Sequence, residues 1–278
     1  MNKTAFVLSG GGAKGSFQVG VLRKLLEKGI IPEAVWGTSV GALNGCGISY
    51  TNIDQLEKIW LGIKKNSDIV KFQLGTVLFA TKGLYSTAPL HSLIKTFVNG
   101  LPDTGIYPHV CMNNLYTGQI AYVNPWNCTS FGMNFDEAVL ASASIPLAME
   151  PVHGVWCDGG VRETVPLKEA IRKGYEDIYV IMCTPWTKNP KNGKEIKNWV
   201  HAGARALDLL THEIFVNDVK TCLDYNDRDY KKTINLHLYA PTEDLNIDTL
   251  EFDPEKIRRG IDTGYNAVEI GHDFIRAL

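Results

Sequence analysis

The sequence predicts an α/β fold built around a mostly parallel sheet. Short runs rich in β-branched residues alternate with longer segments whose apolar residues recur at helical spacing, a pattern typical of strand–helix–strand units. Two of the short runs end in glycine-rich turns that lead into helical segments. The 278 residues are close to the upper size that one hydrophobic core serves. We therefore expect one domain over residues 1–278.

The individual elements follow from the side-chain pattern in chain order. An apolar run at residues 5–8 predicts a buried strand that ends at glycines, and apolar residues at helical spacing over 16–28 predict a helix that Gly29 stops. A second strand at 34–36 leads into a buried helix at 40–50. The later elements are an amphipathic helix at 54–63, strands at 110–112, 119–123, 152–157, 178–183 and 234–239, and helices at 135–143, 166–173, 195–223 and 254–278.

Composition and charge narrow the classes of partner and location. A formal net charge of −2 gives no electrostatic reason to expect a nucleic-acid partner. No segment reaches the roughly eighteen unbroken apolar residues of a membrane-spanning helix, and the first residues lack a signal-peptide pattern. We therefore expect a reducing, cytoplasmic location, with membrane contact only peripheral. The cysteines predict reduced core residues and no metal site, because none lies in a C-x-x-C pair: Cys46, Cys111, Cys128, Cys157, Cys183 and Cys222.

A glycine-rich turn at residues 10–15 follows the first strand. Its glycines satisfy G-x-G-x-x-G, as in dinucleotide-binding turns. That interpretation needs an acidic residue at the end of the second strand to hold the ribose. Here this strand ends in Gly-Thr-Ser, and Glu33 lies before it. The alternative use of such a turn is to offer backbone N–H groups to an anion, such as the oxyanion formed in ester hydrolysis. We favour this second interpretation.

A second turn, Gly37-Thr38-Ser39-Val40-Gly41, fits G-x-S-x-G between a strand and a helix. Such a turn exposes its serine as a nucleophile, and the glycines relieve crowding around the strained backbone. The alternative is that Ser39 only caps the helix that follows. The anion-binding turn on the adjacent strand favours a serine-dependent acyl-ester hydrolase. The ordinary α/β-hydrolase fold is disfavoured, because several strands precede the serine in that fold and only two do here.

The candidate for the general base is Asp158, which ends a strand and precedes Gly159 and Gly160. A carboxylate accepts a serine proton if it is hydrogen-bonded to the hydroxyl and partly desolvated. The alternative is an ordinary Asp-Gly-Gly surface turn. No histidine has a recognisable catalytic setting among the seven in the chain: His91, His109, His153, His201, His212, His237 and His272.

Taken together, these blocks resemble the signature of the patatin-like phospholipases. The motifs lie in the order of that family over about residues 4–185, and residues 186–278 carry no assignable motif and are expected to form a helical C-terminal part of the same domain. The matching blocks are Gly-Gly-Gly-Ala-Lys-Gly at 10–15, Gly-Thr-Ser-Val-Gly at 37–41, Lys-Gly-Leu-Tyr-Ser-Thr-Ala-Pro-Leu at 82–90, Ala-Ser-Ala-Ser-Ile-Pro at 141–146 and Asp-Gly-Gly at 158–160.

The resemblance implies a three-layer α/β/α fold and a Ser39–Asp158 dyad without a catalytic histidine. Ser39 would attack the acyl carbonyl, Asp158 would act as base and then acid, and water would release the acid from an acyl-enzyme. Lys14 would orient the loop or attract an anionic head group. No cofactor or metal is implied, and the substrate would be a phospholipid, lysophospholipid or other carboxylic ester. The oxyanion hole would be formed by Gly10, Gly11, Gly12 and Ala13.

Two departures from the family pattern concern the substrate. Met149 and Glu150 stand where the family more often has an aromatic residue followed by a small residue or proline, and Thr164 stands where asparagine is common. We expect these changes to affect pocket walls and turn packing. An acyltransferase, a thioesterase and a non-catalytic lipid-binding protein remain alternatives on the same scaffold. Residues 70–80, flanked by lysines, fit either an interfacial cap on a bilayer or, as we favour, a segment buried beneath a loop.

Overall fold

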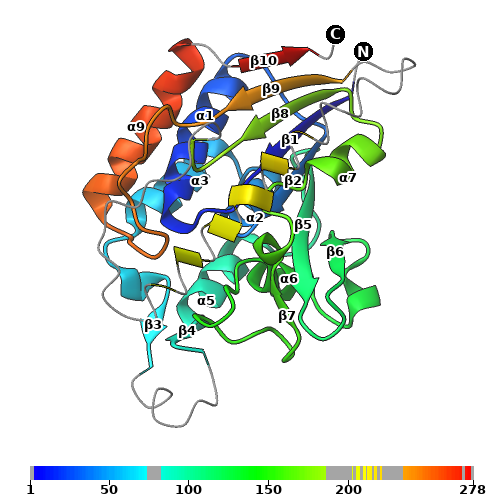
Figure 1. The fold of residues 1–278 in the computed structure, drawn as a ribbon, viewed down its shortest axis with the longest axis vertical. Helices are drawn as coiled ribbons and strands as arrows, with labels where there is room; N and C mark the ends of the chain where they lie inside the picture. The colour runs from blue at the N-terminus through cyan, green and yellow to red at the C-terminus, as the bar shows by residue number, and fades with distance from the viewer. Residues whose placement is uncertain are drawn as a thin grey trace.

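The computed structural model describes residues 3–73, 83–185, 234–270 and 273–276, together with 202, 205–206, 209–210, 212–214, 216–217 and 220. One large sheet organises this part of the chain (Figure 1). It has eight strands in the order β10-β9-β8-β1-β2-β5-β6, with β7 paired to β5. The strands are β1 Thr4–Leu8, β2 Ala34–Thr38, β5 Tyr107–Asn114, β6 Ile120–Val123, β7 Trp156–Asp158, β8 Asp177–Ile181, β9 Asn235–Tyr239 and β10 Asp273–Arg276.

The five central strands, from β9 to β5, are parallel, while β10, β6 and β7 pair antiparallel at the two sides. A separate pair joins β3 Lys71–Phe72 to β4 Tyr85–Ser86. The described helices are α1 Ser16–Glu27, α2 Val40–Tyr50, α3 Ile53–Gly62, α5 Ala88–Phe97, α6 Phe135–Ser142, α7 Leu167–Arg172 and α9 Pro254–Ile270. Short 3-10 turns are η1 Gly12–Gly15, η2 Asn66–Asp68, η3 Cys128–Phe131 and η4 Gly159–Val161.

The sheet is buried on both faces, which is why its central strands are continuously apolar. In β1, Phe6 and Leu8 face a core formed with α1, α2 and α9, whereas Ala5 and Val7 face a second core that includes Leu167 of α7. The helical residue Val216 also packs on this second face. The arrangement confirms the predicted three-layer α/β/α fold.

Most predicted elements are confirmed, and several differ in extent, among them β5, which runs beyond the predicted strand at 110–112 on both sides. The predicted closing helix over 254–278 ends at Ile270, and Asp273–Arg276 instead form β10 against β9, so the C-terminal part contributes strands as well as helices. The predicted strand at 152–157 is shortened to β7, with Val152 making only an isolated bridge to Trp156. The expected helix at 195–223 is described only at scattered helical positions, and residues 186–201 lie outside the described residues.

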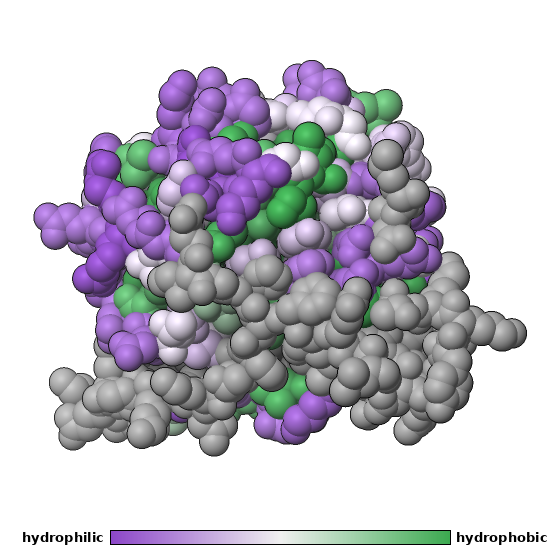
Figure 2. Space-filling model, turned by 90° about the horizontal axis from the view of Figure 1, so that it is seen from above, coloured by the Kyte–Doolittle hydropathy of each residue, from purple (hydrophilic) through white to green (hydrophobic). Residues whose placement is uncertain are grey.

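Burial and surface composition agree with the sequence pattern. The five described cysteines are buried and free, as expected of reduced core residues, and Cys222 lies outside the described part of the chain. Within the described ranges, no helix is both long and apolar enough to cross a bilayer. The face in Figure 2 carries hydrophilic side chains around a short band of hydrophobic ones.

Candidate active site

Ser39 stands at the sharp turn between β2 and α2, at the carboxyl edge of the sheet. Its backbone has φ 57° and ψ −126°, a left-handed conformation that is uncommon for residues other than glycine. A Cβ on Gly37 would overlap the carbonyl of Gly41, so the two glycines let the strand and helix approach each other closely. The Ser39 side chain makes no capping hydrogen bond to α2. The capping alternative is therefore wrong, and the hydroxyl is available for another role.

Asp158 reaches the same place from the other direction, because β7 runs antiparallel to β5 and Asp158 pairs with Met112 near the carboxyl end of β5. Its side chain is only 6% exposed. The carboxylate accepts the Gly160 N–H at 2.7 Å and lies beside the Ser39 hydroxyl. Burial raises the pKa of Asp158 to about 6, although its interactions with the Ser39 hydroxyl and the Gly160 N–H act to lower it. The structure thus brings the two predicted residues together.

Two serines of the 141–146 block hold the two turns in place, a role that the sequence did not reveal. The buried hydroxyl of Ser142 accepts the Ser39 N–H at 3.0 Å and donates to the Cys111 carbonyl at 2.6 Å. The carbonyl of Ser144 accepts the Asp158 N–H at 2.9 Å. One short segment therefore fixes the backbone at both Ser39 and Asp158.

The glycine turn lies beside Ser39, and its four candidate donors are not equivalent. The Gly10 N–H donates to the Thr164 carbonyl at 3.0 Å, and the Ala13 N–H donates to the Thr249 carbonyl at 2.9 Å. In the part of the chain that the structure describes, the N–H groups of Gly11 and Gly12 have no such partner. Gly12 also lines the same cavity as Ser39. These two N–H groups are consequently the ones available to an anion.

Lys14 follows on η1 and is partly buried. Burial raises the pKa of the Cys183 thiol beneath the turn, to a net value of about 12, while a hydrogen bond with Ser9 and the positive charge of Lys14 act to lower it. The ammonium group therefore adds positive potential close to the glycine turn.

Ser39 opens onto a cavity with apolar walls. Residues of α2, α3 and α5 form most of the lining, including Leu43, Trp60 and Ile94. The one amide in the lining, Asn44, donates to Gly15 and Gln18 and accepts the indole N–H of Trp60 at 2.8 Å. Its polar atoms are thus engaged within the protein. The cavity offers an apolar space next to the reactive hydroxyl.

The departures seen in the sequence lie where expected. Met149 is buried and lines the cavity, while Glu150 is exposed. Thr164 lies at the junction of the glycine turn and η4. Its hydroxyl donates to the Gly160 carbonyl at 3.4 Å, and its carbonyl accepts the Gly10 N–H.

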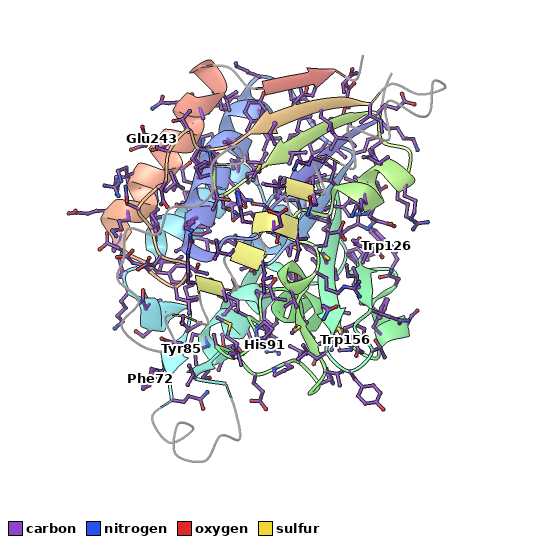
Figure 3. All side chains as sticks on the ribbon, in the orientation of Figure 1. Phe72, Tyr85, His91, Trp126, Trp156 and Glu243 are labelled. Carbon is purple, nitrogen blue, oxygen red and sulfur yellow. The ribbon has the colours of Figure 1, made fainter. Side chains whose placement is uncertain are left out.

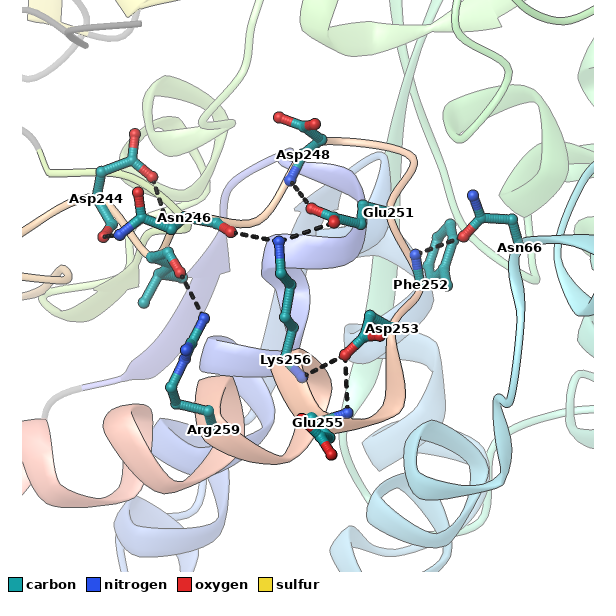
Figure 4. Close-up of polar contacts among 11 residues, drawn as sticks. Asn66, Asp244, Asn246, Asp248, Glu251, Phe252, Asp253, Glu255, Lys256 and Arg259 are labelled. Atoms are coloured by element: carbon teal, nitrogen blue, oxygen red, sulfur yellow. Dashed lines mark hydrogen bonds and ion pairs between the residues drawn. The ribbon is translucent and has the colours of Figure 1, made fainter. Parts of the chain in front are cut away.

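A loop from the last third of the chain completes the site, although no motif marked it. Leu250 and Phe252 line the cavity, and the neighbouring Thr249 carbonyl holds the glycine turn. The loop is fastened by polar contacts (Figure 4): Asn66 accepts the Phe252 N–H at 2.7 Å, and Lys256 donates to the Glu251 carboxylate at 2.7 Å. The sequence signal for this loop is a set of four apolar residues within an acidic stretch: Leu245, Ile247, Leu250 and Phe252.

The contacts described for the histidines lie elsewhere. His109 stacks on Trp36 with ring centroids 4.3 Å apart, and burial lowers its pKa to about 4. His91 pairs with Asp136, and His237 stacks on Tyr179. Figure 3 labels His91 among the side chains.

A family model described as patatin-like phospholipase matches residues 6–171. The chain is 41% identical over 54 residues to triacylglycerol lipase ptl3 of Schizosaccharomyces pombe, which is 19% of this chain and 11% of that protein. It is 26% identical over 242 residues to the uncharacterized protein YjjU of Escherichia coli, 80% of this chain and 65% of that protein. The chain thus spans less than two thirds of these relatives.

Among solved structures, VipD from Legionella pneumophila aligns over 99% of this chain and 68% of its own, with a TM-score of 0.47 and 13% identity.

Proposed function

The chain belongs to the patatin-like phospholipase family, and from this premise we propose that it is a lipid acyl hydrolase that uses a Ser39–Asp158 dyad. The observation that carries the proposal is the position of the Ser39 hydroxyl, which lies beside the buried Asp158 carboxylate and lines an apolar cavity. A hydroxyl, a base and a place for an acyl chain are the minimum that ester hydrolysis needs.

The reaction follows from the positions of the groups. Asp158 takes the hydroxyl proton while the Ser39 oxygen attacks the ester carbonyl carbon, and the resulting oxyanion accepts the N–H groups of Gly11 and Gly12. As the tetrahedral intermediate collapses, Asp158 returns the proton to the leaving alcohol, and the acyl group remains on Ser39. Water then attacks the acyl-enzyme while Asp158 takes its proton. As this second intermediate collapses, Asp158 returns the proton to the Ser39 oxygen, so that the acid leaves and both the Ser39 hydroxyl and the Asp158 carboxylate are restored.

The environment of Asp158 suits its proposed roles as general base and then general acid. A pKa of about 6 leaves the carboxylate ionised at neutral pH, so that it can accept a proton. It is also far more basic than an ordinary carboxylate of pKa about 3.9, which strengthens its pull on the serine proton. Lys14 supports the same step by adding positive potential beside the turn that would bind the oxyanion.

Labelling with a fluorophosphonate tests the nucleophile. We expect one adduct on Ser39 in the folded protein, no adduct after thermal unfolding, and no adduct in Ser39→Ala. Peptide mapping by mass spectrometry locates the label. Incubation with a mixed lipid extract should then release free fatty acid from the wild type and none from Ser39→Ala. An unlabelled Ser39 in folded protein, or equal release by the variant, would contradict the proposal.

The pKa of Asp158 predicts the pH dependence of turnover. Since the free enzyme needs the ionised carboxylate, kcat/KM should fall about tenfold per pH unit below pH 6 and level off above it. The measurement is kcat/KM for p-nitrophenyl butyrate, a water-soluble ester, over the acid and neutral range. A profile that stays flat well below pH 5 would show that a different group acts as the base.

A further inference from the structure

An exposed leucine marks the edge of the cavity. Leu147 is 76% exposed, although its neighbours Ile145 and Met149 both line the apolar space. Its backbone has φ 70°, in the left-handed region, and sterics disfavour that region for a branched side chain such as leucine. Backbone strain of this kind is found where a residue has a functional position. The chain here holds a large apolar side chain toward solvent beside the cavity that receives the acyl group.

A second exposed apolar residue, Phe72, belongs to the segment 70–80, for which the sequence pattern favours burial beneath a loop. Val70 is buried as expected, Phe72 is not, and residues 74–80 lie outside the described part of the chain. Phe72 of β3 is 57% exposed and its ring packs edge-on against Tyr85 of β4, with centroids 5.7 Å apart (Figure 3). The Tyr85 N–H donates to the Ala148 carbonyl at 2.8 Å, which joins the β3–β4 pair to the turn that carries Leu147. We refer to Phe72, Tyr85 and Leu147 as the apolar rim.

Lysines border the apolar rim. Lys65 and Lys71 line a surface concavity together with Ser67 and Ser92, and Lys64 is exposed next to them. Asp68 lies in the same concavity, but its carboxylate already accepts the backbone N–H groups of Lys64 and Lys65 at 2.9 and 3.2 Å.

The local charge therefore differs from that of the whole chain. Within residues 64–72 three lysines outnumber one aspartate, whereas the chain as a whole has a formal net charge of −2. Apolar side chains that project from a lysine-bordered surface are complementary to a bilayer with anionic head groups.

We propose that the apolar rim and Lys64, Lys65 and Lys71 dock the protein on a lipid bilayer that carries anionic head groups. The inference rests on the proposed function, because it supplies the route by which a lipid acyl chain enters the cavity. Phe72 and Leu147 insert among the acyl chains, the lysines contact phosphates, and the substrate moves from the bilayer to Ser39 along the apolar wall next to Leu147. Ile31 is an exposed apolar residue that lies elsewhere, because it precedes β2 and so stands at the opposite end of that strand from Ser39.

Vesicle co-sedimentation tests the surface. Ser39→Ala serves as the parent, so that the lipids stay intact, and vesicles contain phosphatidylcholine with or without phosphatidylglycerol. Adding Phe72→Ser and Leu147→Ser should lower the partition coefficient at least tenfold, while the matched control Ile31→Ser, also an exposed apolar residue, should leave it unchanged. Lys65→Gln with Lys71→Gln should abolish the preference for phosphatidylglycerol and the dependence on salt. Equal partition of the rim variant and the parent overturns the proposal, as does an equal loss in the control.

Activity separates this inference from the proposed function. On the wild-type background, Phe72→Ser with Leu147→Ser should lower hydrolysis of vesicle phospholipid by a similar factor and leave kcat/KM for p-nitrophenyl butyrate unchanged. An equal loss on both substrates overturns the docking role. If the wild type hydrolyses neither substrate but its partition still depends on the rim, the docking surface stands and the proposed function fails.

Discussion

Replacing Asp158 with asparagine is expected to lower kcat by about 10³-fold or more while leaving the fold intact. An amide cannot take the proton of Ser39, and loss of a positioned general base costs about 10²- to 10⁴-fold. The side-chain oxygen of asparagine can still accept the Gly160 N–H, so the turn that follows β7 should keep its geometry. The measurement is turnover of p-nitrophenyl butyrate together with far-UV circular dichroism.

The same substitution should also stabilise the protein. The folded state holds Asp158 at a pKa of about 6, above the ordinary value of 3.8, so the folded protein binds the proton more tightly than the unfolded chain does. Burial of the ionised form therefore weakens the fold as pH rises from about 4 to about 6, and the full cost is present above pH 6. A pKa difference of about two units between the folded and unfolded states corresponds to about 3 kcal/mol at neutral pH. This value is the upper estimate for the increase in the free energy of unfolding caused by Asp158→Asn.

Denaturant unfolding at pH 7 and pH 5 measures this effect. The free energy of unfolding of Asp158→Asn should exceed that of the wild type by more at pH 7 than at pH 5. The exposed control Asp103→Asn should have the wild-type free energy of unfolding at both pH values. Turnover that survives in Asp158→Asn would place the base elsewhere in the chain. A loss of stability would instead mean that the carboxylate has a structural role.

The local chemistry of this site was readable from sequence, whereas its walls were not. Ser39 and Asp158 each stand beside glycines that only a special backbone requires, and such positions leave a mark in a short window of sequence. The cavity, in contrast, collects Trp60, Ile94 and Phe252 from segments far apart in the chain. Ordinary apolar residues at helical spacing predict a buried face, but not which neighbour covers it.

The glycine turn at residues 10–15 also shows what the sequence could not indicate, here which N–H groups are free to donate. The sequence indicated four donors, and tertiary contacts with Thr164 and Thr249 engage those of Gly10 and Ala13. Neither carbonyl has a signature in the sequence, because any residue offers one. The strand β10 was missed for a related reason, since its few residues continue the apolar pattern of the preceding helix and only pairing with β9 distinguishes them.

Gly12→Ala is expected to lower kcat by about 10²- to 10³-fold, the cost of misplacing one oxyanion donor. A Cβ at Gly12 would overlap the Thr249 carbonyl oxygen, and the backbone there has φ 59°. Either the glycine turn or the 244–253 loop must then move, and the N–H would leave the position where the oxyanion forms. Gly29→Ala is the matched control, because Gly29 has φ 77° but an added Cβ meets nothing within 4 Å. Gly29→Ala therefore has the backbone strain of a positive φ but no steric overlap of its Cβ.

The kinetic pattern distinguishes a displaced donor from a general loss of structure. An oxyanion donor acts mainly in the transition state, so Gly12→Ala should lower kcat with little change in KM for a water-soluble ester. The inflection near pH 6 should persist, since it belongs to Asp158. Both alanine variants should lose stability from strain, but only Gly12→Ala should lose turnover per folded molecule and label slowly with fluorophosphonate. Wild-type turnover in a folded Gly12→Ala protein would assign the oxyanion to other donors.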